Sequence, residues 1–226
     1  MKTKLLMLCM TLFVNCLIAQ TFTNMTSVLN NTGGSTPCVA DMNGDGLDDV
    51  VTLSGNDISI DYQQPDGTFD QVIYDVNAQN SPSWSIAAGD LNSDGYLDLM
   101  FGGGSRVSFY LSNSTGTAFT EQFIDDYIFS QRTNIVDIDN DGDLDAFACH
   151  DVDLSHPYRN DGTGFMTEDQ SLVATVPLAG NYASVWTDFD NDGDTDLYIA
   201  KCRGGSSPGD VERENALYVN DGSGNY

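Results

Sequence analysis

The feature that most constrains this chain is an acidic nine-residue segment that occurs four times. The copies are DMNGDGLDD (41–49), DLNSDGYLD (90–98), DIDNDGDLD (137–145) and DFDNDGDTD (188–196), with first residues 49, 47 and 51 positions apart. A short apolar run precedes each copy, and another run follows it. A weaker Tyr- and Gly-containing segment comes about twenty residues later, or about thirty in the last copy. A period near 49 residues with short apolar runs and Gly/Asn/Asp turns is typical of a repeat architecture.

Each repeat has room for about four strands of 4–6 residues, and no window shows a helical period over three turns. One blade cannot cover its own apolar face, so neighbouring blades must stack. We therefore predict an all-β chain, a β-propeller of four-stranded blades. The expected repeats are 35–82, 83–130, 131–180 and a truncated 181–226, after a lead-in at 21–34.

The chemistry of the nine-residue segment points to a metal. Positions 1, 5 and 9 are Asp, position 3 is Asn or Asp, and position 6 is Gly in every copy. Alternate oxygen side chains around a sharp Gly turn converge on one point, which suits Ca²⁺. Position 7 varies, as expected where only a backbone carbonyl is used. The candidate ligands are Asp41, Asn43, Asp45, Leu47, Asp49, Asp90, Asn92, Asp94, Tyr96, Asp98, Asp137, Asp139, Asp141, Asp143, Asp145, Asp188, Asp190, Asp192, Asp194 and Asp196.

Several alternatives fit less well. An EF-hand needs Glu at position 12 and flanking helices, whereas position 12 here is Thr52, Phe101, Ala148 or Ile199. The period is too long for nine-residue β-helix repeats. The four acidic segments contain no His or Cys, which argues against zinc as their metal. A single copy fits a metal-free Asx-rich turn, but four copies favour four Ca²⁺ ions, one per repeat.

The pattern D-x-[DN]-x-D-G-x-x-D between apolar runs resembles the FG-GAP/VCBS-type repeat, which builds the calcium-binding propeller of integrin α chains and of many secreted bacterial proteins. The resemblance covers about residues 35–226. It implies the ligands named above and a propeller, usually of seven blades. With four repeats present, we interpret the chain as the N-terminal part of a longer protein, a secreted bacterial member of the family.

The net charge and the N-terminal sequence limit the expected location of the protein and the partners that it can bind. Residues 1–20 have the layout of a secretory signal peptide, with Lys2 and Lys4, an apolar run and Ala19. All 34 acidic residues follow position 20, so the mature chain has six basic residues and a formal charge of −28. Such a chain repels nucleic acid and anionic membranes. We expect secretion to the extracellular space or cell surface, no membrane insertion after signal cleavage, and no nucleic-acid partner.

Cysteine and histidine usage leaves two questions open. Cys38, Cys149 and Cys202 remain after signal cleavage, and either one disulfide or buried free thiols fits an exported chain. His150 and His156 have no Ser or Cys nucleophile motif beside them, so no catalytic residue is predicted.

Two functions therefore compete. The favoured one is a calcium-binding interaction or adhesion module for an extracellular protein or glycan, without enzymatic activity. The alternative is the propeller portion of a polysaccharide-acting lyase or hydrolase. If the strand before each acidic segment is innermost, as the resemblance implies, then Trp84, Arg132 and Tyr182 lie at one mouth of the channel. These side chains are common binding anchors, although packing between blades also explains the two aromatic residues.

Overall fold

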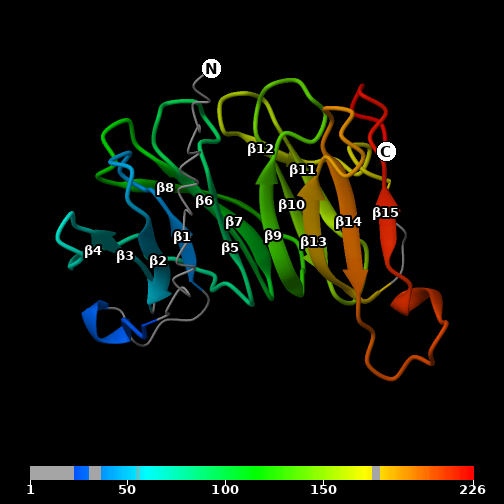
Figure 1. Ribbon diagram of the computed structural model, residues 1–226, viewed down its shortest axis with the longest axis horizontal. Helices are drawn as coiled ribbons and strands as arrows, with labels where there is room; N and C mark the ends of the chain where they lie inside the picture. The colour runs from blue at the N-terminus through cyan, green and yellow to red at the C-terminus, as the bar shows by residue number, and fades with distance from the viewer. Residues whose placement is uncertain (1–22, 31–36, 55, 175–178) are drawn as a thin grey trace, which may run out of the picture.

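Four antiparallel β-sheets lie side by side in an arc (Figure 1). They are seen in a computed structural model that describes residues 23–30, 37–54, 56–174 and 179–226. The predicted signal peptide at 1–20 lies outside the described residues. No helix in the described part of the chain has the length and apolar character needed to cross a membrane.

Each sheet is a blade whose strands follow chain order. Blade 1 has β1 (Cys38–Ala40), β2 (Asp49–Ser54), β3 (Asp57–Gln63) and β4 (Phe69–Tyr74). Blade 2 has β5 (Ile86–Gly89), β6 (Asp98–Gly103), β7 (Arg106–Ser112) and β8 (Phe119–Ile124). Blade 3 has β9 (Ser130–Val136), β10 (Asp145–His150), β11 (His156–Asn160) and β12 (Met166–Glu168). Blade 4 has three described strands, β13 (Asn181–Thr187), β14 (Asp196–Lys201) and β15 (Ala216–Tyr218). Two short 3₁₀ helices, η1 (Thr26–Val28) and η2 (Val211–Arg213), lie outside the sheets.

The acidic segment has the same place in every blade. It joins the first strand to the second, and its ninth residue is the first residue of the second strand. The registers agree, with Ala40 opposite Asp49, Gly89 opposite Asp98, Val136 opposite Asp145 and Thr187 opposite Asp196. The predicted all-β fold of repeated, stacked blades is therefore confirmed, and we name the four segments loops 1 to 4.

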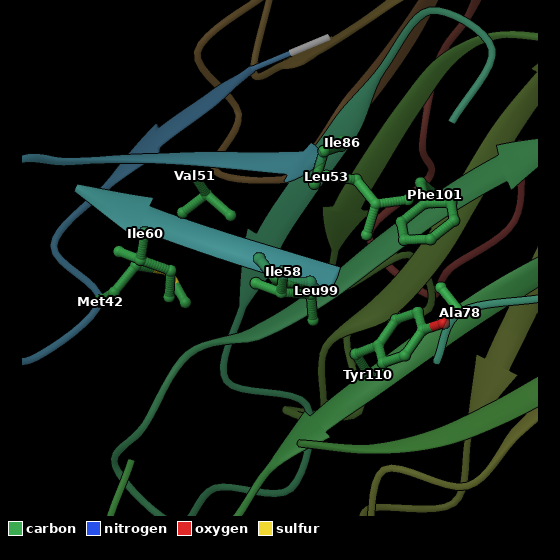
Figure 2. Close-up of a cluster of buried hydrophobic side chains, with 10 residues drawn as sticks. All are labelled: Met42, Val51, Leu53, Ile58, Ile60, Ala78, Ile86, Leu99, Phe101 and Tyr110. Carbon is green, nitrogen blue, oxygen red and sulfur yellow. The ribbon is translucent and has the colours of Figure 1, made fainter. Parts of the chain in front are cut away.

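The apolar core lies between blades. Figure 2 shows Leu53 and Ile58 of blade 1 in one buried cluster with Leu99 and Phe101 of blade 2. Similar clusters lie between blades 2 and 3 and between blades 3 and 4. Alternating side chains place one apolar face of each sheet against its neighbour, and the stack buries what a single sheet would expose.

Loop position 2 takes part in this packing. Met42, Leu91 and Ile138 are at most 5% exposed because each lies within the cluster that the next blade completes. The equivalent Phe189 of blade 4 is 47% exposed. Each acidic loop in blades 1–3 is thus anchored to the blade that follows it.

First strands of neighbouring blades also contact one another. Ser85, just before β5, shares a hydroxyl–hydroxyl hydrogen bond of 2.8 Å with Thr133 of β9, and Ser184 of β13 donates to Asn134 of β9. These contacts place β9 between β5 and β13 (Figure 1). The three cysteines among the described residues, Cys38, Cys149 and Cys202, are all free thiols.

Candidate metal centres

The Asp at loop position 9 ties three parts of its blade together. In loop 3, Asp145 accepts hydrogen bonds from the backbone N–H of Ile138, at loop position 2, and of Asn160, at the end of the third strand, at 3.1 and 2.8 Å. Asp49, Asp98 and Asp196 make the same pair of bonds in their own blades. All four side chains are at most 1% exposed. Each carboxylate oxygen keeps a second lone pair, so it can also bind a cation.

The Asp at position 1 folds the loop back on itself. One oxygen of Asp41 accepts from the N–H of Gly46 at 2.8 Å, and the bond recurs in loops 2, 3 and 4. The glycine at position 6 has φ between 86° and 101° in all four loops. A Cβ on any of these glycines would meet no atom within 4 Å. Glycine is therefore required at position 6 for its positive φ and not for space.

Position 4 has the same left-handed backbone, which the sequence analysis did not single out. Its occupants are Gly44, Ser93, Asn140 and Asn191, with φ of 74°, 55°, 60° and 63°. Asn is among the side chains best tolerated there. The recurrence of Gly, Ser and Asn at position 4 was the sequence signal for this left-handed conformation.

In loops 3 and 4, the carboxylates at positions 1, 3 and 9 come together. In loop 3, the ligand atoms of Asp137, Asp139 and Asp145 all lie within 4.8 Å of one another, and Asp188, Asp190 and Asp196 form the same group in loop 4. One oxygen of each position-5 carboxylate also accepts the N–H of position 7, at 2.8 to 3.1 Å. In loops 1 and 2 the position-3 side chain is an amide, Asn43 or Asn92.

Loop 3 shows most directly that an oxygen-binding cation fits. Asp137 Oδ1 and Asp139 Oδ1 are buried without a hydrogen-bond partner. Asp139 uses its other oxygen to pair with Arg159, which also bonds Asp169 Oδ2 at 2.9 Å. Buried carboxylate oxygens without partners are costly, and an all-oxygen donor set suits Ca²⁺. The residues that would hold the ion include those at positions 1, 3 and 9, and positions 5 and 7 remain predicted ligands.

Electrostatics also favour a cation. Burial raises the pKa of Asp98 and of Asp145 to about 6, and the other carboxylates of the same loop add to the increase. The pKa of Asp49 is raised for the same reasons. Carboxylates held close together and away from water resist ionisation, and a bound divalent cation would relieve this cost.

The turn that follows the third strand, which we call the outer turn, contacts the neighbouring blade. The sequence did not indicate this contact. Asn160 in blade 3 donates to the carbonyls of Leu91 in loop 2 and Leu144 in loop 3, at 2.6 and 2.8 Å. Tyr226 in blade 4 donates in the same manner to the carbonyl of Ile138 in loop 3 at 2.9 Å. The outer turn of one blade therefore holds the acidic loop of the blade before it.

The three proposed mouth residues are exposed. Trp84 and Tyr182 are 60% and 48% exposed, and Arg132 is exposed as well. They lie just before β5, in β9 and in β13, at the ends of the first strands away from the acidic loops. Arg132 lines two neighbouring grooves of about 360 and 390 Å³ between these strands. Burial between blades does not account for either aromatic side chain.

Stacked antiparallel blades that each carry the same acidic loop define a β-propeller built from repeats. The chain belongs to the FG-GAP-like repeat family, whose model matches residues 41–101, 90–148 and 137–199. Each match runs from one acidic loop into the strand after the next loop. No curated protein is significantly similar in sequence.

A solved lectin structure has a similar fold, and two further structures are similar at lower scores. A lectin of Agrocybe aegerita, described as recognising non-reducing terminal N-acetylglucosamine, is 20% identical with a TM-score of 0.58, over 83% of this chain and 49% of the lectin. A Tc holotoxin pore of Photorhabdus luminescens is 18% identical with a TM-score of 0.45, over 72% of this chain and 8% of its own. The biofilm matrix protein Bap1 of V. cholerae is 18% identical with a TM-score of 0.41, over 79% and 30%. The chain thus spans about half of the lectin and less of the other two.

Proposed function

We propose that this chain is a secreted, calcium-binding propeller that acts outside the cell as a binding module for a glycan or a protein. The observation that carries the proposal is the fourfold acidic loop, with its buried position-9 Asp and its unpartnered oxygens in loop 3. The signal-like segment at 1–20 supports export. The role of Ca²⁺ is to neutralise the loop carboxylates and so to stabilise the junctions between blades.

The proposed ligand surface is the mouth formed by Trp84, Arg132 and Tyr182. A glycan is the first ligand class to test, because the lectin of similar fold is described as recognising a terminal sugar. That likeness is one of fold, so it identifies no binding residue here. Exposed aromatic rings and an Arg beside a groove are suited to a sugar ring or a peptide.

The test is a glycan array probed with the protein in saturating Ca²⁺, followed by titration of the best ligand. Trp84→Ala, Arg132→Ala and Tyr182→Ala should each weaken binding about tenfold or more, as the loss of a binding anchor does. Phe165→Ala is the matched control, because Phe165 is 58% exposed but lies in the outer turn of blade 3. A ligand whose affinity is unchanged in all three mouth variants would reject this surface.

A further inference from the structure

Three side chains that commonly bind metals meet at the end of blade 3 that lies away from the acidic loops. His156 is the first residue of β11, Glu168 is the last residue of β12, and Asp126 follows β8 of blade 2. Their ligand atoms all lie within 4.8 Å of one another. The group therefore joins two blades, which is why the sequence alone did not reveal it.

His156 makes this group more than a pair of surface acids. The residue is 7% exposed, and its Nδ1 is buried with no hydrogen-bond partner. Nδ1 lies 3.6 Å from Asp126 Oδ2 and 3.6 Å from Glu168 Oε1, too far for a hydrogen bond. A buried imidazole nitrogen without a partner is costly, and this one faces the space between two carboxylates.

The surroundings leave room for an ion and hold one of its ligands in place. The group lines a pocket of about 320 Å³ together with Tyr127, His150 and Gln170. Gln170 Nε2 donates to Glu168 Oε1 at 3.0 Å and to the Ser155 carbonyl at 3.1 Å. Outer contacts of this kind fix the orientation of metal ligands. Among the described residues, no ion pair joins Lys or Arg to Asp126 or Glu168.

We propose that His156, Asp126 and Glu168 form a Zn²⁺ site that is separate from the calcium loops. One imidazole nitrogen with two carboxylates suits zinc better than calcium, which prefers oxygen ligands alone. Zinc bonds of about 2.0–2.2 Å place neighbouring tetrahedral ligands about 3.3–3.6 Å apart, which agrees with the two 3.6 Å separations. Neutral His156 and two carboxylates balance the charge of one Zn²⁺. The fourth coordination position is left to water from the pocket.

The competing explanation is a protonated His156 that pairs with both carboxylates and needs no metal. The two explanations are distinguished by a calorimetric titration of Zn²⁺ into the full chain, with saturating Ca²⁺ present to occupy the acidic loops. Co²⁺ in place of Zn²⁺ gives a second readout, because four-coordinate Co²⁺ absorbs visible light far more strongly than Co²⁺ in an octahedral oxygen site.

We expect a single equivalent of Zn²⁺, with affinity reduced at least tenfold by Asp126→Asn and by Glu168→Gln. Asp126 is partly exposed, so its substitution leaves the fold intact, which circular dichroism verifies. Asp125→Asn is the matched control, because Asp125 is a neighbouring acid that pairs with Arg106 at 3.0 Å, outside the group. Absence of Zn²⁺ binding in saturating Ca²⁺, or equal affinity in the Asp126 and Asp125 variants, would overturn the proposal. Neither result bears on Ca²⁺ binding by the loops.

Discussion

At the scale of single residues, backbone conformation shapes each acidic loop as much as charge does. Positions 4 and 6 both have positive φ, with Asn140 at 60° and Gly142 at 97° in loop 3. Two left-handed residues so close together turn the chain sharply. The turn brings the N–H of Gly142 within 3.1 Å of Asp137 Oδ2.

Gly142→Ala should therefore destabilise the protein by about 1–2 kcal/mol, since an L-residue with left-handed φ carries a cost of that size. A Cβ at this position would meet no neighbour, so steric overlap does not contribute. Gly104→Ala is the matched control, because its Cβ also meets nothing and its φ is not positive. Urea unfolding should give a neutral or slightly stabilising effect for Gly104→Ala. Equal effects of the two substitutions would contradict this explanation.

Buried carboxylates set a pH dependence for the metal-free protein. Burial raises the pKa of Asp98 and of Asp145 to about 6, whereas an unfolded Asp has a pKa of about 3.9. The native state thus binds more protons between about pH 4 and pH 6, and the contribution of these groups to stability falls as pH rises through that window. Ca²⁺ needs ionised ligands, so its stabilising effect grows as the pH rises through the same window.

Thermal melts in chelator and in saturating Ca²⁺ measure both effects. In chelator, the melting temperature should be higher at pH 5 than at pH 7. The increase caused by Ca²⁺ should be larger at pH 7 than at pH 5. Asp145→Asn should flatten the pH dependence in chelator, because it removes one titrating group. Parallel pH profiles with and without Ca²⁺ would contradict this prediction.

At the scale of elements, the outer turn of blade 3 joins two blades. Asn160 is 3% exposed, and its side chain bonds carbonyls in loops 2 and 3 while accepting from Gly162 and Gly164 in its own turn. The bond to Leu91 is the one that crosses between blades.

Asn160→Ala should lower stability by about 2–4 kcal/mol, because it leaves several buried backbone groups without partners. Asn113→Ala is the control, since Asn113 organises the corresponding turn of blade 2 but is exposed and bonds only within that turn. Its substitution should cost less than about 1 kcal/mol. If denaturant unfolding gave similar losses for both variants, the contact between blades would not be the stabilising feature.

The sequence predicted the repeated unit well because its period and turn residues are local signals. The acidic loops, the strands on either side of them and the glycine at position 6 all follow from spacing. The partners of Asn160 and Tyr226 could not be predicted, because they depend on how one blade stacks on the next. The meeting of Asp126 with His156 and Glu168 has the same origin.

At the scale of the whole molecule, calcium binding and blade stacking are expected to stabilise each other. Each acidic loop in blades 1–3 buries its second residue in the core shared with the next blade. An ion that binds only the folded loop adds about 2.7 kcal/mol per site when its concentration is a hundredfold above its dissociation constant. We therefore expect the loops to couple metal binding to the junctions between blades.

The central claim, one Ca²⁺ in each acidic loop, is tested most directly by counting bound ions. Equilibrium dialysis of the folded protein at neutral pH and saturating Ca²⁺ should give four ions per chain. Asp41→Asn, Asp90→Asn, Asp137→Asn and Asp188→Asn should each reduce the count by one, because each removes a position-1 carboxylate. Asp143→Asn should leave the count unchanged, because position 7 is expected to offer only its carbonyl. A folded chain that binds no Ca²⁺, or a count that none of the four substitutions reduces, would contradict the account.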